Sequence, residues 1–274
     1  MRKTILEMLK EQAVNYSQEA EKIDKLFCEN ALGRRTSLEY YADIEIKNWK
    51  HRGTIINSKE MREVLNLPIP NEFRAYDLID ENNILDFFEF ILNMINLAKD
   101  GVLTNEYAEV RREVMKKFDT ILENIKYILE KIGYKMHIVD RFVSIVKKSE
   151  EAIAVAELYE DIADKIIEYQ RYSIGLNRKR DLLSALSNRY EQIEQNLKAN
   201  CQSELCNDIG TILNNLKIRH GKTSNDEFVE KMTKEELEEW YDKCYDCLLL
   251  AFMTNKYLEY KKDIKNLRCM LKSK

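Results

Sequence analysis

The stretch RKRDLLSALSNRYEQIEQNLKA, residues 178–199, decides the fold class of this chain. At about 100° per residue, its charged side chains gather on one side of a helix. The opposite side collects apolar residues, namely Leu182, Leu183, Leu186, Tyr190, Ile193 and Leu197. This period predicts an amphipathic helix that buries one stripe against neighbouring helices.

The rest of the chain favours the same kind of element. Only seven Gly and two Pro occur among 274 residues, which leaves few turn formers for a sandwich or barrel with many hairpins. Apolar periods and capping signals predict further helices over residues 3–31, 38–49, 59–65, 72–99, 105–131, 137–172, 203–219 and 234–262. We therefore predict an all-α helical bundle. An N-terminal helical region, 1–100, contains an irregular segment near 50–71, and a second bundle covers 101–274.

Charge and hydropathy exclude several classes of partner. The net charge is −4 with acidic and basic residues interspersed, whereas binding to duplex DNA needs a concentrated basic patch. The most apolar stretch, 84–97, is interrupted by charged and amide side chains and is too short to span a bilayer. The N-terminus lacks the apolar run of a signal peptide. We expect a cytoplasmic protein with reduced cysteines and no membrane partner.

Two cysteine pairs are candidate zinc ligands, Cys201 with Cys206 and Cys244 with Cys247. Both pairs fall in or beside helical pattern, where nearby cysteines simply share an apolar face, and no glycine turn lies inside either pair. The Glu-x-x-His pair of di-iron bundles and the glycine-rich phosphate loops are also missing from the sequence. We expect no metal and no cofactor, and a scaffold with a structural zinc remains an alternative.

The segment NNLKIRHG, residues 214–221, contains the candidate site. If the helix runs to residue 220, Asn215 and Arg219 lie on one side of its apolar stripe and His220 lies near the other edge. An imidazole moves protons near neutral pH, and a guanidinium binds phosphate bidentately. We assign His220, Arg219 and Asn215 as candidate catalytic residues for RNA cleavage without a metal, and Asn214 and Lys222 as candidate substrate-binding residues. The alternative is that Arg219 and His220 only complement the helix C-terminus, where cations are favoured.

Three stretches in order, RKRDLLSAL at 178–186, DIGTIL at 208–213 and NNLKIRH at 214–220, resemble a known family. They are similar to the C-terminal helical domains of bacterial abortive-infection proteins, within the HEPN (higher eukaryote and prokaryote nucleotide-binding) superfamily. The resemblance covers roughly residues 140–260. It implies a bundle that often dimerises across a shared cleft, and many relatives are metal-independent endoribonucleases of phage defence. By position, it implies that His220 transfers the proton, Arg219 binds the phosphate and Asn215 orients them.

The chain departs from the common HEPN pattern, which places an Arg ahead of the His with four to six residues between them. Here those places hold Asn215, Asn214 and Leu213. The first hypothesis is a toxin-type endoribonuclease that acts on RNA as a homodimer or with a partner defence protein. The second is a non-catalytic helical subunit of a defence complex that binds RNA or protein. The missing Arg and the acidic net charge favour the second.

Overall fold

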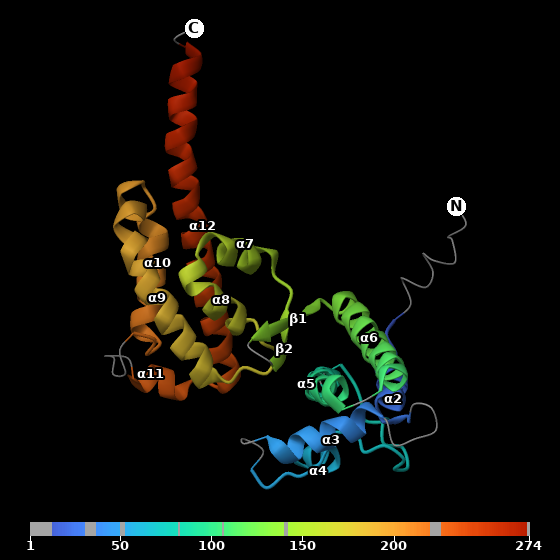
Figure 1. Ribbon diagram of the computed structural model, residues 1–274. Coiled ribbons are helices and arrows are strands. Elements are labelled where there is room, and N and C mark those ends of the chain that lie inside the picture. The colour runs from blue at the N-terminus through green and yellow to red at the C-terminus, as the bar shows by residue number, and fades with distance from the viewer. Residues whose placement is uncertain are drawn as a thin grey trace, which may run out of the picture. The chain divides into compact units, whose positions relative to one another are not determined.

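The computed structural model describes residues 13–30, 37–49, 53–81, 83–105, 107–139, 142–219 and 226–272 of the chain. These residues are mostly helical, which confirms the predicted fold class, and they include a small two-stranded sheet (Figure 1). The chain divides into two compact units, Met1–Ile145 and Val146–Lys274. We expected the division after residue 100, and it falls later because α5, α6 and the first strand pack within the N-terminal unit.

The N-terminal unit contains α2 (Tyr16–Cys28), α3 (Leu38–Asn48), α4 (Ser58–Val64), α5 (Ile84–Asn105) and α6 (Ala108–Lys131). α3 packs along α5, and α2 contacts α3, α5 and α6. The predicted cap of α3 is confirmed, since the Ser37 hydroxyl accepts a hydrogen bond from the Tyr40 N–H at 3.1 Å. The buried core is aromatic and branched, and includes Phe27, Leu38, Ile46, Phe87, Phe88, Ile91, Ile121 and Ile125.

The helix predicted over 72–99 begins and ends later than expected. Residues 70–78 form turns, and α5 begins at Ile84 after Asp80 and Asn83 exchange side-chain hydrogen bonds with each other's backbone N–H at 2.8 and 3.2 Å. We expected Gly101 to end this helix, but α5 continues to Asn105. One glycine costs a helix about 1 kcal/mol, and burial of Val102 one residue later offsets a cost of that size.

The prediction of a single helix over 137–172 is wrong. This stretch forms β1 (Tyr134–Val139), β2 (Phe142–Lys147), α7 (Glu150–Leu158), a 3₁₀ turn η1 (Glu160–Ile162) and α8 (Ala163–Tyr169). Side chains of α5 satisfy one edge of β2. Asn93 donates to the Val143 carbonyl at 2.8 Å and accepts from the Val143 N–H at 2.9 Å, and Glu89 accepts from the Ile145 N–H at 3.0 Å. α5 therefore takes the place of a third strand.

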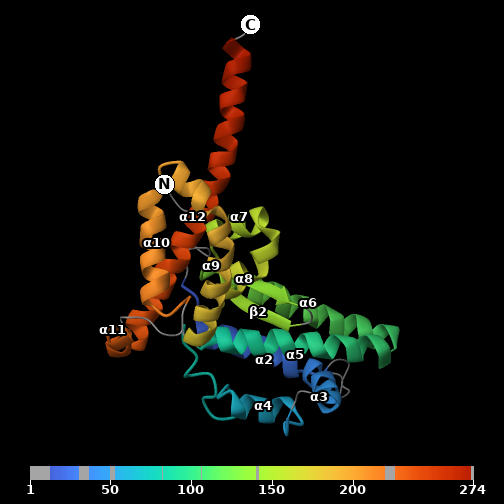
Figure 2. The same ribbon diagram turned by 90° about the vertical axis from the view of Figure 1, so that its left-hand side faces the viewer.

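The C-terminal unit is built around a central helix, α12 (Lys234–Lys272), the last element of the chain. α12 packs against α9 (Leu176–Ala199), α10 (Ser203–Asn215) and α7, and α8 packs against α7 and α9 (Figure 2). The short α11 (Asp226–Lys231) precedes it. The predicted capping box is confirmed: Glu236 N–H donates to the Thr233 hydroxyl at 3.1 Å, and Thr233 N–H donates to the Glu236 carboxylate at 2.8 Å. α12 runs past residue 262, where we expected its end.

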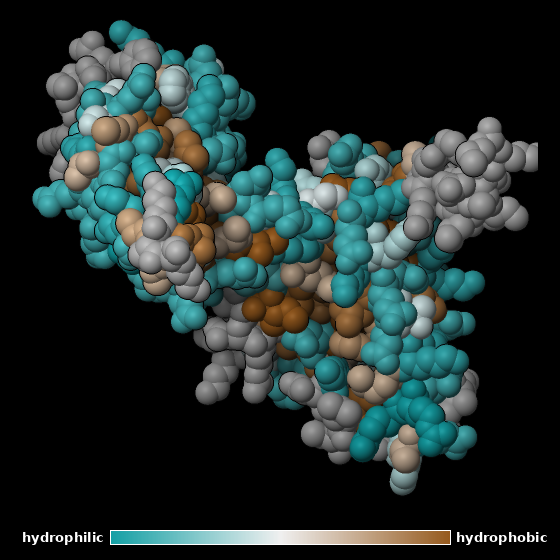
Figure 3. All heavy atoms as spheres, turned by 90° about the horizontal axis from the view of Figure 1, so that it is seen from above, coloured by the Kyte–Doolittle hydropathy of each residue, from teal (hydrophilic) through white to brown (hydrophobic). Residues whose placement is uncertain are grey.

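The face of the molecule drawn in Figure 3 is largely hydrophilic. In Figure 3, charged and amide side chains cover most of the face that is seen from above, and hydrophobic patches lie between them. None of the helices in the described parts of the chain is long and apolar enough to cross a membrane.

Candidate functional site

The end of α10 differs from the prediction that this helix reaches residue 219. The last helical residue is Asn215, and the Leu216 N–H closes the helix by donating to the Ile212 carbonyl at 3.0 Å. Lys217 follows in the left-handed region with φ of 57°, a common way for a helix to end. This turn directs Ile218 into the core, where it is buried. Arg219 therefore lies outside the helix, and the position that we predicted for it from the helical period is wrong.

Arg219 instead lies back against α9. Its Nε is 3.2 Å from a carboxylate oxygen of Glu191, and its side chain is 17 % exposed. Its Nε and Nη2 are both buried, and neither has a hydrogen-bond partner among the described residues. The site thus holds a guanidinium at the edge of the core, with one charge partner and two donors that are not used.

Buried polar groups surround Arg219. The Tyr190 hydroxyl is buried, and burial and the neighbouring Cys206 thiol raise its pKa, while Arg219 acts in the opposite direction. Burial likewise raises the pKa of Cys244 to about 12, again against the effect of Arg219. The phenol and the Cys244 thiol therefore stay protonated near neutral pH. Arg219 supplies the positive charge of this cluster.

The surface around Arg219 carries both signs of charge. Lys198 lies 2.9 Å from Glu194, and Lys217 lies 3.5 Å from Glu230. Glu191 itself is about half exposed. A phosphate that binds Arg219 must compete with the Glu191 carboxylate, and an exposed ion pair of this kind contributes only about 0.2–1 kcal/mol.

The structure places three of the five predicted site residues. Asn214 is exposed at the end of α10. Asn215 donates from its amide nitrogen to the Thr211 carbonyl one turn earlier, at 2.7 Å, so this donor is used within the helix. His220 and Lys222 lie outside the described residues. Arg219 is thus the predicted residue that the structure brings into a polar cluster, and the orienting role of Asn215 stays a prediction.

The sequence interpretation missed two residues of this cluster, Tyr190 and Glu191. We placed Tyr190 on the apolar stripe of its helix, which is correct, since the side chain is fully buried. The sequence does contain one signal for Tyr190, which is a tyrosine within an otherwise aliphatic stripe. A buried tyrosine hydroxyl usually needs a hydrogen-bond partner. No local signal connects Glu191 to Arg219, since the two residues are far apart in sequence.

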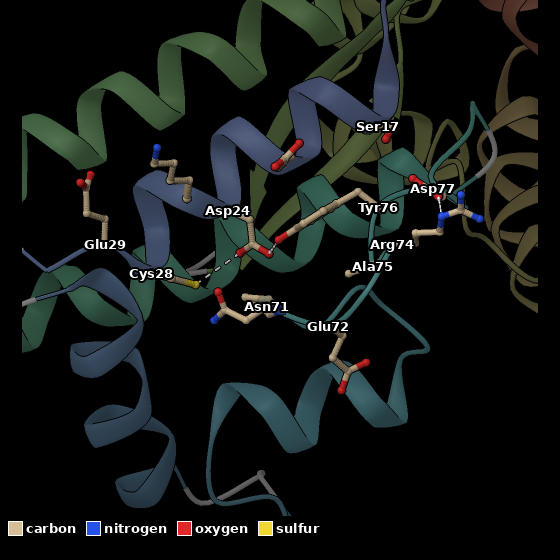
Figure 4. Close-up of a pocket in the computed structure, with 13 residues that line it drawn as sticks. Ser17, Asp24, Cys28, Glu29, Asn71, Glu72, Arg74, Ala75, Tyr76 and Asp77 are labelled. Atoms are coloured by element: carbon tan, nitrogen blue, oxygen red, sulfur yellow. Dashed lines mark hydrogen bonds and ion pairs between the residues drawn. The ribbon is translucent and has the colours of Figure 1, made fainter.

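A second polar cluster lies in the N-terminal unit, beside a pocket of about 590 Å³ between α2 and the loop that follows α4 (Figure 4). Its centre is Asp24 of α2, which is buried and ion-paired with Arg62 of α4. The Tyr76 hydroxyl donates to Asp24 at 2.6 Å, and the Cys28 thiol lies 3.6 Å from it.

The Asp24 cluster has the properties of a structural network. Arg62 also donates to the Pro68 carbonyl at 2.8 Å, and its guanidinium lies 4.8 Å from the centre of the Phe90 ring. Burial and the Asp24 charge raise the pKa of both Cys28 and Tyr76 far above their ordinary values. The thiol and the phenol therefore stay protonated at neutral pH, and the network fastens the loop to α2 and α4.

The described residues contain no group of three or more His, Cys, Asp or Glu side chains that could hold a metal ion. All six cysteines are free thiols; of the predicted zinc pairs, Cys206 and Cys244 are buried and Cys201 is exposed. Comparison of the chain with family models, with curated proteins and with solved structures gave no match.

Proposed function

We propose that the C-terminal unit cleaves RNA without a metal ion, as a cytoplasmic toxin-type protein of phage defence. The observation that carries this proposal is the Arg219 guanidinium, which lies at the edge of the core with two unused buried donors. His220 is the next residue in the sequence, so the two side chains start from Cα atoms about 3.8 Å apart. A phosphate-binding cation and a proton-transfer group are thus adjacent in the chain.

The proposed chemistry uses these two groups in sequence. The His220 imidazole removes the proton of a ribose 2′-hydroxyl, and the resulting oxygen attacks the neighbouring phosphorus. Arg219 stabilises the negative charge that develops on the phosphate oxygens. The bond to the 5′-oxygen breaks, and this oxygen takes up a proton. The products are a 2′,3′-cyclic phosphate and a free 5′-hydroxyl.

The test is incubation of the purified chain with cellular RNA in excess chelator, followed by analysis of the RNA ends. We expect cleavage with cyclic phosphate ends, and a loss of about 100-fold or more in His220→Ala, in line with the contribution of general base catalysis. Cleavage that is unchanged in His220→Ala would show that the site is assigned wrongly.

Arg219→Ala needs a matched control, because loss of a half-buried arginine can also disturb folding. Arg189 lies on the same helix as Glu191 and also forms an ion pair, with Asp161 at 3.0 Å. We expect Arg219→Ala to lose cleavage and Arg189→Ala to keep it, with both variants retaining their helical circular dichroism. Equal losses in the two variants would contradict a direct role for Arg219.

The second candidate function is a non-catalytic subunit of a defence complex that binds RNA or protein. It is favoured by the pairing of Arg219 with Glu191 and by the missing upstream Arg. The two candidates differ in one measurement. A catalytic chain cuts RNA by itself, whereas a binding subunit retards labelled RNA, or binds a partner, and leaves the RNA intact.

A further inference from the structure

The C-terminal part of α12 has no packing partner within its own unit. The last buried residue of α12 is Leu258, and residues 259–271 are all exposed. Figures 1 and 2 both show this end of the helix projecting beyond α7, α9 and α10. A helix of this length without tertiary contacts is only marginally stable in water, because isolated helices need roughly 12–15 residues even when their sequence is favourable.

The exposed face of α12 carries an apolar seam with the spacing of a coiled coil. Its residues alternate at intervals of three and four, and their exposed fractions lie between 40 % and 66 %. The seam consists of Leu250, Met253, Tyr257, Tyr260, Ile264, Leu267 and Leu271. Residues at these intervals occupy the a and d positions of three heptads, which meet a second helix in coiled coils. This seam is distinct from the face that packs on the bundle, which includes Tyr241, Cys244 and Leu248.

The seam is large enough to form a stable interface. Each of its side chains leaves on the order of 100 Å² in water at these exposed fractions. The six side chains of each copy from 250 to 267 would therefore bury roughly 1,200 Å² in total, which is the lower end of the range of specific protein interfaces. Monomeric proteins rarely leave a continuous apolar surface of this size in water.

The charges of α12 select an antiparallel partner. Residues 234–250 contain six acidic and two basic residues, whereas residues 251–271 contain five basic and two acidic ones. Asp246, on the exposed face of the first half, already has a raised pKa because of burial and then the nearby Asp242 and Glu151 charges. In the register that the seam sets, residues 251–271 of one copy lie opposite residues 246–266 of the other, so individual charge pairs decide the direction, together with the helix dipoles, which run in opposite directions in an antiparallel pair.

The spacing of the seam residues determines how two α12 helices align. When Leu250 of one copy lies opposite Leu267 of the other, the six side chains from 250 to 267 pair in layers across the interface. The same register places Lys256 of each copy beside Asp263 of the other. A parallel pair would gain Asp263 beside Arg268, but it would also place Lys256 beside Lys261.

We propose that this chain forms a homodimer through an antiparallel coiled coil between the exposed seams of two α12 helices. The interface does not depend on the proposed function, because the seam includes none of the residues of the Arg219 cluster. The occupant is a second copy, because the seam pairs with itself in layers and the same register brings Lys256 of each copy beside Asp263 of the other.

The first test measures the mass of the full chain by light scattering at about 50 µM, where a dimer of micromolar affinity is mostly formed. We expect twice the chain mass of 32.6 kDa. Ile264→Lys with Leu267→Lys should return the chain to a monomer. Asn266→Lys with Cys269→Lys, which adds the same charge off the seam, should leave the dimer intact. A monomeric wild-type chain, or equal effects of the two double variants, would overturn the proposal and leave the seam to another partner.

The second test determines direction by disulfide formation, in a chain whose exposed Cys201 and Cys269 are replaced by serine. In the antiparallel register, Leu250→Cys and Leu267→Cys chains cross-link when they are mixed. Neither chain should link to itself, since equal residues would lie about 25 Å apart at 1.5 Å per residue. Self-linking of each single variant would show a parallel pair and overturn the orientation.

Discussion

At the scale of the residue, a single left-handed position decides what the candidate site contains. Lys217 takes a positive φ after α10 ends, and the chain turns so that Ile218 is buried and Arg219 reaches Glu191. On a continuous helix, Arg219 would lie one turn from Asn215. The turn instead places the guanidinium beside a fully buried tyrosine, where its charge is less screened than on an open helix surface.

Removing the carboxylate that competes for Arg219 should strengthen RNA binding. We expect Glu191→Gln to raise affinity for a labelled RNA by up to about fivefold, because an ion pair with an exposed partner contributes about 0.2–1 kcal/mol. Fluorescence anisotropy at constant salt measures this change. Glu194→Gln, on the same helix and with the same change in charge, is the matched control. An equal gain in both variants would mean that net charge alone is responsible.

Asp246 should make the stability of the C-terminal unit depend on pH. Burial, then the Asp242 and Glu151 charges, raise its pKa above the ordinary 3.8, against the effect of Lys147. At pH 7 the Asp246 carboxylate is charged in the folded and the unfolded state, and its charge lowers the free energy of unfolding. This destabilisation disappears below pH 3.8, where Asp246 is protonated in both states. We expect Asp246→Asn to raise the urea midpoint at pH 7 and to have no effect at low pH. A gain at low pH would contradict the cause given.

At the scale of the element, the caps of two helices were predictable and tertiary replacements were not. Ser37 and the Thr233–Glu236 pair cap the helices that their sequence patterns indicate, because a cap involves residues only three positions apart. The strand pair 134–147 was missed because a short apolar run suits a strand or a buried helix equally well. Glu89 and Asn93, which satisfy one edge of β2, come 56 and 50 positions before the residues that they bond.

The capping box predicts a measurable contribution to α12. We expect Thr233→Ala to destabilise the C-terminal unit by about 1 kcal/mol, because the N–H of Glu236 loses its acceptor. Thr211→Ala, inside α10, is the matched control. Its hydroxyl donates to the Asn207 carbonyl within the helix, where alanine is at least as favourable. Thermal unfolding of both variants measures the difference, and equal destabilisation would argue against the capping role.

At the scale of the whole molecule, the six cysteines should differ in reactivity according to their burial. We expect Cys201 and Cys269, which are exposed, to react rapidly with a maleimide at pH 7. Cys206 and Cys244 should react only in denaturant, since both are buried and the pKa of Cys244 is raised to about 12. Mass spectrometry of alkylated peptides measures the order. Protection of Cys201 that disappears with chelator would instead support the zinc alternative.

The sequence by itself determined that the chain is helical, because the apolar period of residues 178–199 and the scarcity of glycine and proline act locally. It also determined the caps at Ser37 and at Thr233, and the identity of Arg219 as a candidate. Only the tertiary structure decided that Glu191 and Tyr190 surround Arg219, that α5 supports β2, and that the α12 seam lacks a partner. These features depend on which distant residues come together, and that outcome follows from packing over the whole unit rather than from a local pattern.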